Sequence, residues 1–142
     1  MRWIVKLTVV ASSVILSLVS CGEETPSRDH IPVIKAQLFA LQEAVKDYDH
    51  ARIDSLLSVK ILDNDQSSDS LLHFVYGPNN QFAFHVFGGA RIFYTHRHGV
   101  IDCYVMDSSR SQNRPIRLEY ILDGENWLLY RFGPGEVEEP RD

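Results

Sequence analysis

The chain of 142 residues has only two cysteines, Cys21 and Cys103, so it cannot rely on a disulfide framework. A domain of this size must then be stabilised by a hydrophobic core. Basic residues are also few, with 14 Lys and Arg against 19 Asp and Glu, and the formal charge of −5 argues against nucleic acid and against adhesion to anionic lipid. The sequence lacks a glycine-rich phosphate loop, a nucleophile elbow and a nucleotide-binding motif.

The apolar run at the N-terminus is too short to span a membrane. It extends from Leu7 to Ser20, behind the basic residues Arg2 and Lys6. A transmembrane helix needs about 20 apolar residues, whereas the apolar region of a cleavable signal needs about 7 to 15. We therefore predict a signal peptide over residues 1–20. Its removal lowers the basic count from 14 to 12, which leaves a formal charge of −7.

The segment Leu18-Val19-Ser20-Cys21 resembles the lipobox of bacterial lipoproteins. The resemblance implies cleavage before a Cys21 that carries lipid, and Cys103 is then left without an intramolecular partner. Three acyl chains would hold the protein on a membrane, because each buried methylene contributes about 0.8 kcal/mol. Gly22 after the cysteine implies the outer membrane in a two-membrane cell; in a one-membrane cell the protein would lie on the outer face of the cell membrane. An ordinary secretory signal with a chance cysteine is the alternative.

Composition divides the rest of the chain into three parts. Residues 21–30 carry the lipidated cysteine and form a polar tether, residues 31–133 are predicted to form a single domain, and residues 134–142 a disordered acidic tail. Extended at about 3.3 to 3.6 Å per residue, the tether lets the domain stand roughly 30 Å from the lipid.

Apolar residues at alternating spacings of three and four predict a first helix with one buried stripe. The stripe consists of Ile31, Ile34, Leu38, Leu41, Val45 and Tyr48. Asp49 is placed to cap a second, shorter helix. Its inward residues are Ile53, Leu56 and Leu57. A third helix is expected around residues 71–76, capped by Ser67, Ser68 or Asp69 and stopped by Gly77-Pro78. Residues 81–87 fit either a helix or a strand.

After Gly88-Gly89 the apolar period changes to two and predicts two hairpins. The strands are expected at residues 90–97, 100–107, 116–123 and 126–132, with turns at His98-Gly99 and Gly124-Glu125. If Arg97 pairs with Val100, the core face of the first hairpin holds Ile92, Tyr94, His96, Ile101, Cys103 and Val105. The other face holds Arg91, Phe93, Thr95, Arg97, Asp102, Tyr104 and Met106. Inward residues of the second hairpin are Leu118, Tyr120, Leu122, Trp127 and Leu129. Helices followed by antiparallel strands predict an α+β domain with the helices on one face of the sheet.

Two segments resemble the nuclear transport factor two-like superfamily, also described as a cystatin-like or SnoaL-like cone. Residues 47–58 are similar to its helix, acidic break and second helix ending in a leucine pair. Residues 118–129 are similar to its closing hairpin, in which a tryptophan leads the last strand. The resemblance implies a curved sheet and a cavity between the first helix and that sheet. It implies no particular reaction, because the fold hosts enzymes, carriers and interaction modules.

The candidate site residues are aromatic and imidazole side chains. Tyr48, Tyr94 and Tyr120 could line a cavity for an apolar ligand, or could simply fill the core. His96 and His85 are the candidates for acid–base chemistry. Asp102 is expected on the face away from His96, in a surface ion pair near Arg97. His85, His96, His98 and Cys103 provide no third close ligand, so neither a metal nor another cofactor is expected.

These observations predict a lipid-anchored protein of the cell envelope. Its domain is expected to bind a small apolar ligand or another envelope protein, without catalysis and without nucleic acid. The carboxylates of the isomerases in the superfamily have no inward-facing counterpart in this sequence. An isomerase or dehydratase with a His/Tyr site in the cavity remains the alternative.

Overall fold

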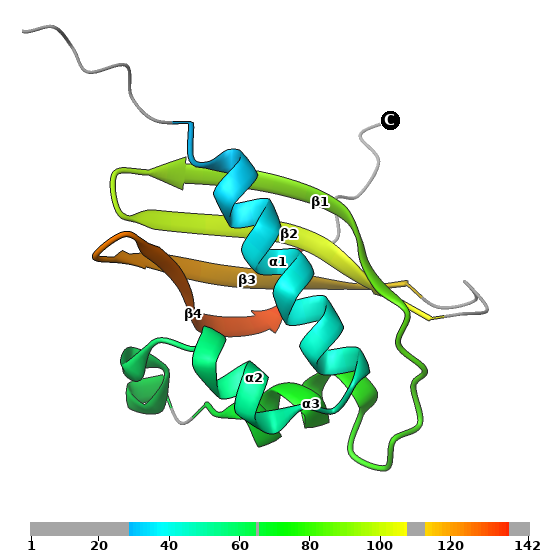
Figure 1. Ribbon diagram of the computed structural model, residues 1–142. Coiled ribbons are helices and arrows are strands. Elements are labelled where there is room, and N and C mark those ends of the chain that lie inside the picture. The colour runs from blue at the N-terminus through cyan, green and yellow to red at the C-terminus, as the bar shows by residue number, and fades with distance from the viewer. Residues whose placement is uncertain (1–28, 65, 108–112, 137–142) are drawn as a thin grey trace, which may run out of the picture.

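The computed structural model describes residues 29–64, 66–107 and 113–136. The elements in this part of the chain are α1 (Ile31–Lys46), α2 (His50–Leu56), the 3-10 helix η1 (Val59–Asn64), α3 (Ser68–Tyr76), β1 (Val86–Thr95), β2 (His98–Met106), β3 (Asn113–Asp123) and β4 (Asn126–Pro134). The strands form one antiparallel sheet in the order β1-β2-β3-β4. The sheet is curved and the helices lie on one of its faces (Figure 1). The predicted α+β architecture is confirmed. The predicted signal peptide and Cys21 lie outside the described residues.

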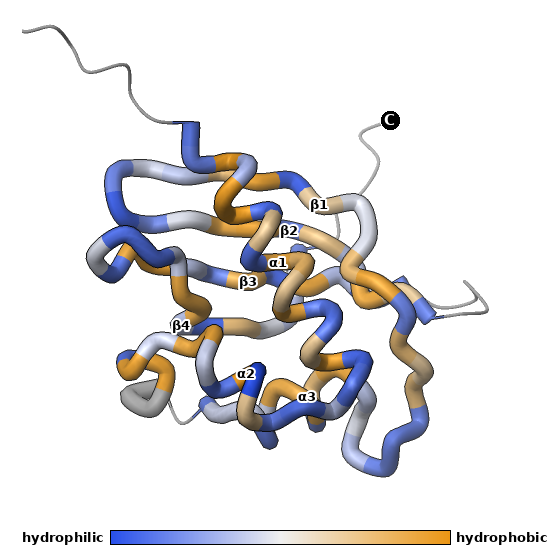
Figure 2. Tube along the Cα trace, viewed as in Figure 1, coloured by the Kyte–Doolittle hydropathy of each residue, from blue (hydrophilic) through white to orange (hydrophobic). Residues whose placement is uncertain are grey.

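Helix α1 places most of the predicted stripe in the core. Ile34, Leu38, Leu41 and Val45 are buried, and hydrophobic and hydrophilic residues recur along the helix as Figure 2 shows. Tyr48 lies beyond the end of the helix, with a left-handed φ of 51°. The stripe therefore ends one turn earlier than the sequence predicts.

Side chains cap both of the following helices. Asp49 accepts a hydrogen bond from the backbone N–H of Arg52 at 3.0 Å. Ser67, one of the three predicted candidates, caps α3 and forms a capping box with Ser70. Leu57 packs against the core as predicted, but it is extended and bridges to Leu129 on β4 instead of continuing α2.

The edge strand β4 is partly covered by polar contacts. The backbone N–H of Ser58 donates to the carbonyl of Leu129 at 2.7 Å. Gln66 pairs its side-chain amide with the backbone of Phe132 through two hydrogen bonds of 2.7 and 3.1 Å. Such contacts satisfy the exposed backbone groups of an edge strand and discourage further strand pairing.

The first hairpin turns earlier than predicted, at His96-Arg97. Thr95 pairs with His98, where the prediction paired Arg97 with Val100. Gly99 lies within β2, and a Cβ added there would come 3.3 Å from Cζ3 of Trp127. The glycine thus permits close packing against the tryptophan and is not part of the turn. The predicted core-face position of His96 is wrong, because this residue is exposed in the turn with φ 26°.

Strand β1 also begins earlier than predicted, at Val86, and contains a register shift between Gly88 and Arg91. Gly89 has a left-handed φ of 62° in this shift. The shift reverses the alternation of faces, so that Phe87 as well as Ile92 contributes to the core.

The last strand, β4, continues to Pro134, and the backbone N–H of Gly135 donates to the carbonyl of Pro115. The predicted disordered tail therefore does not begin at residue 134.

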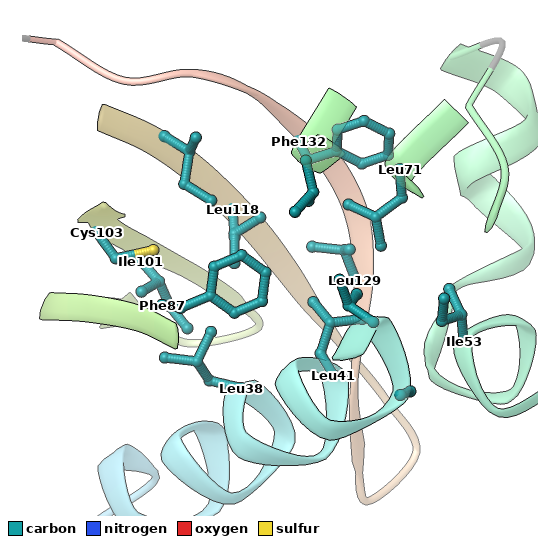
Figure 3. Close-up of a cluster of buried hydrophobic side chains, with 14 of the residues drawn as sticks. Leu38, Leu41, Ile53, Leu71, Phe87, Ile101, Cys103, Leu118, Leu129 and Phe132 are labelled. Atoms are coloured by element: carbon teal, nitrogen blue, oxygen red, sulfur yellow. The ribbon is translucent and has the colours of Figure 1, made fainter. Parts of the chain in front are cut away.

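The core lies between the helices and the inner face of the sheet. Leu38 and Leu41 of α1 face Phe87, Ile101 and Leu118 of the sheet (Figure 3). Ile53 and Leu71 extend the cluster towards Leu129 and Phe132 (Figure 3). The predicted inward positions of the second hairpin are confirmed for Trp127, Leu129, Leu118 and Tyr120, all at most 1% exposed.

Arg114 joins β3 to the end of α3. Its guanidinium donates to the carbonyl of Phe74 at 3.1 Å and also to that of Val75, and it lies 4.2 Å above the ring of Phe82. The last carbonyls of a helix have no partner within the helix, and a cation there also opposes the negative end of the helix dipole. Burial lowers the pKa of Arg114.

We expect Arg114→Ala to lower the free energy of unfolding by about 1.5 to 3 kcal/mol, because hydrogen bonds to a charged group are lost. Arg114→Lys should recover only part of this, since an ammonium lacks the planar fork. The matched control is Arg52→Ala, which removes an exposed ion pair with Asp47 and should cost about 0 to 1 kcal/mol. Urea unfolding of the three variants checks the order, and equal losses for Arg114→Ala and Arg52→Ala would contradict it.

Candidate functional site

The space between α1 and the sheet is filled by side chains. Trp127 and Tyr120 lie there beside Ile34 and Leu41, all at most 1% exposed. The indole N–H of Trp127 donates to Nδ1 of His30 at 3.1 Å, and the two rings meet edge to face. The larger depressions found in the described part of the chain lie at the surface. The cavity implied by the family resemblance is therefore occupied by aromatic residues of the core.

Tyr120 belongs to this core and does not line a cavity. Its hydroxyl is buried and has no hydrogen-bond partner within the described residues. Burial raises the pKa of Tyr120, and the nearby thiol of Cys103 raises it further. The hydroxyl is thus neutral at physiological pH.

The remaining candidates lie far apart along the chain and are not brought together. Tyr48 is 48% exposed and stacks on Tyr76 with 4.5 Å between ring centroids. Tyr94 is half-buried and contacts His30 edge to face. His85 and His96 are both exposed, and they flank opposite ends of the ten-residue strand β1. These positions do not assemble one His/Tyr site inside the cone.

The soft-ligand residues do not converge either. Among the described residues, no group of three or more His, Cys, Asp and Glu side chains is placed to hold a metal ion. Cys103 is 3% exposed in the core, and burial raises its pKa to about 12, with Asp102 as a smaller cause. A thiol in this environment is protonated and unreactive.

The outer face of the sheet, opposite the helices, carries two adjoining surface depressions. One has a volume of about 410 Å³ and lies by Arg91, Asp102 and Arg117, and the other has a volume of about 310 Å³ and lies by His98. Both are lined by Phe93 and Val100, which are cross-strand partners on β1 and β2. We call this the outer-face groove.

A hydrogen-bonded chain of three side chains lies at one end of this groove. The hydroxyl of Tyr130 donates to the carboxylate of Glu119 at 2.7 Å, and Nε2 of His98 lies 2.9 Å from the same hydroxyl. Burial and the bond to Glu119 raise the pKa of Tyr130 to about 12, although Arg131 opposes the shift. Tyr130 therefore remains a hydrogen-bond donor at neutral pH. The chain fixes the position of His98 at the groove.

An ion pair lies at the other end. Nε and Nη2 of Arg117 donate to the two carboxylate oxygens of Asp102 at 2.8 and 3.0 Å. This bidentate pair raises the pKa of Arg117. The sequence predicts that Asp102 forms its ion pair near Arg97. This prediction is wrong, because the observed registers place Arg91 and Arg117 beside Asp102.

Sequence reasoning did not bring Tyr130 and Glu119 together, because they meet across β3 and β4. A register shift between Glu119 and Tyr120 leaves Tyr130 as the extra residue on β4. A single sequence carries no period that reveals such a bulge. The period of two in the apolar residues did place Phe93 and Asp102 together on the outer face of the sheet. The sequence therefore carried a signal for an aromatic and a charged side chain at this groove.

Comparisons with known proteins support the architecture. No family model matches the sequence, and no curated protein matches it. A variant of Rd1NTF2_05 with five substitutions is similar in structure, with a TM-score of 0.54, 12% identity, and coverage of 75% of this chain and 100% of that chain. This similarity shows the fold alone.

Two further structures are more distant. An Ntf2-like protein involved in plasmid conjugation has a TM-score of 0.47 at 11% identity over 77% of this chain, which spans 42% of that protein. A protein from Streptomyces avermitilis, described by name as a candidate dehydratase of the NTF2-like family, has a TM-score of 0.48 at 13% identity, over 75% of this chain and 95% of that one. The fold expected from residues 47–58 and 118–129 is confirmed by the first similarity.

Proposed function

We propose that this domain, which has the nuclear transport factor two-like fold, is the exported part of a bacterial lipoprotein that binds another envelope protein without catalysing a reaction. The observation that carries the binding proposal is the contrast between the two faces of the sheet. The inner face is filled by core side chains, whereas Phe93 is 55% exposed on the outer face. An interior ligand site would require the core to open.

The anchor is supported by the sequence before the domain. Arg2, Lys6 and the segment ending in Cys21 have the order of a lipoprotein signal. In the described part of the chain, no helix is long and apolar enough to cross a membrane. Cys103 lies in the core, which is consistent with a Cys21 whose sulfur is used for lipid and not for a disulfide.

A protein partner suits the outer-face groove better than a small molecule does. Small-molecule sites bury most of the ligand in a concave cavity, whereas these two depressions lie side by side on a sheet. Aromatic and arginine side chains are enriched in protein interfaces, and Phe93, Tyr104, Arg91 and Arg117 present both kinds here. The carboxylate of Asp102 is already paired, which lowers the cost of covering it.

Catalysis by a His/Tyr site inside the cone, as an isomerase or dehydratase would need, finds no support in these positions. His85 and His96 are exposed at opposite ends of β1, and Tyr120 is sealed in the core. A general base must lie within hydrogen-bond reach of a bound substrate. The binding function is therefore the one that the geometry supports best.

The test is photocrosslinking in intact cells, with p-benzoylphenylalanine replacing Phe93 of the full chain. We expect a crosslinked product of discrete mass that mass spectrometry identifies as an envelope protein. Thr95→Arg on the same face should abolish it by obstructing the groove. The matched control replaces Phe39, which is 62% exposed on α1, and should give no such product. Equal crosslinking from both positions, or a product consisting of two copies of this chain, would overturn the proposal.

A further inference from the structure

A separate depression of about 500 Å³ lies between η1 and the end of the sheet where both hairpins turn. It is lined by Ser58, Val59, Lys60, Arg97, Ile121, Leu122 and Asp123. Figure 1 shows the β1–β2 and β3–β4 turns at the same end of the sheet. The volume falls within the usual range for small-molecule sites, roughly 300 to 1,000 Å³. None of its lining residues belongs to the outer-face groove.

Arg97 is held in place on one wall of this depression. Its carbonyl accepts from the backbone N–H of Leu122 at 2.9 Å, and its Nη2 donates to the carbonyl of Leu122 at 3.1 Å. These two bonds tie the turn of the first hairpin to β3 and fix the guanidinium. A guanidinium has two edges that donate two parallel hydrogen bonds, one formed by Nε with Nη2 and one by Nη1 with Nη2. The bond to Leu122 uses one N–H of Nη2, so the edge that carries the other N–H remains for a ligand.

The lining places a cationic group beside apolar surface. Its charged side chains are those of Lys60, Arg97 and Asp123. The side chains of Ile121 and Leu122 are half-buried, and Val59 is 80% exposed at the rim. A cationic group beside apolar surface matches a ligand that has one anionic end and an apolar body.

We infer that this depression binds a small carboxylic acid with an aromatic or aliphatic body. The carboxylate lies on the guanidinium of Arg97, which presents donors at the spacing of carboxylate oxygens. The apolar body covers Val59 and Leu122. This site is distinct from the outer-face groove and does not depend on the proposed protein partner.

The experiment is a chemical-shift titration of the ¹⁵N-labelled full chain with 3-phenylpropionate, compared with its uncharged amide. We expect the Nε–H signal of Arg97 and the backbone amide of Leu122 to shift with the acid and to stay unchanged with the amide. Arg97→Gln should weaken binding about tenfold, since a charge-assisted bidentate pair is lost.

Arg52→Gln is the matched control, because this exposed arginine lies on α2 and pairs with Asp47. It should leave the titration unchanged. Equal binding of the acid and the amide, equal losses for Arg97→Gln and Arg52→Gln, or no shift at Arg97 would overturn the inference. Inorganic phosphate binding as tightly as the acid would also overturn it, because the apolar body would then contribute nothing.

Discussion

Trp127→Ala is expected to lower the free energy of unfolding by about 3 to 5 kcal/mol, the usual cost of removing a large aromatic side chain from a core. Trp127 is fully buried and contacts residues that are distant in the sequence. Its ring lies against the position of Gly99 on β2, and its N–H donates to His30 just before α1. Removing it opens a hole between sheet and helix that the tightly paired strands cannot close.

Leu38→Ala tests the facing side of the same core and should cost about 2 to 5 kcal/mol. Phe39→Ala on the next residue is the control, because Phe39 is 62% exposed whereas Leu38 is 7% exposed. It should change the stability by less than about 0.5 kcal/mol. Chemical unfolding of the three variants gives the comparison. A Trp127→Ala or Leu38→Ala protein as stable as Phe39→Ala would mean that the helix face or the strand parity is wrong.

Cys21→Ser is expected to abolish lipidation completely. The proposed lipid is joined through a thioether, so exchanging sulfur for oxygen removes the attachment while the apolar run is unchanged. Without acyl chains the protein loses about 0.8 kcal/mol of membrane affinity for each methylene that was buried. The variant should accumulate as an unprocessed precursor or as protein without lipid.

Labelled palmitate incorporation, measured together with membrane fractionation, checks this expectation. The wild type should be labelled and sediment with membranes, with the outer membrane in a two-membrane cell. Cys103→Ser is the matched control, because the second cysteine lies in the core and should keep full labelling. Equal labelling of wild type and Cys21→Ser, or a wild type found wholly in the soluble fraction, would refute the anchor and its location.

The fold was predictable to the extent that burial follows a period. The stripe of α1 and the inward residues of the second hairpin were read from spacings of three to four and of two. The turn at Gly124-Glu125 is confirmed by the pairing of Asp123 with Asn126. In these cases a local pattern and the final packing favour the same structure, so a window of the sequence is sufficient.

The turn of the first hairpin was not predictable in the same way. A glycine after a histidine resembles a turn, yet Gly99 serves the close approach of Trp127, which is 28 residues later in the chain. Ile92 and Cys103 face the core as predicted, because the observed register differs from the predicted one by an even number of residues. The core position predicted for His96 is wrong, because this residue is part of the turn.

By itself the sequence determined most of the buried stripe of α1 and the inward residues of the second hairpin, since amphipathic periods follow from the geometry of single helices and strands. It also carries the whole case for the anchor, because a signal is recognised as a linear segment. Only the tertiary structure decided that the space beneath α1 is filled and that His98, Tyr130 and Glu119 meet on the outer face. The first outcome depends on the volumes of the core side chains, and the second depends on the register between strands. Both involve residues that are distant in sequence, so no local pattern encodes them.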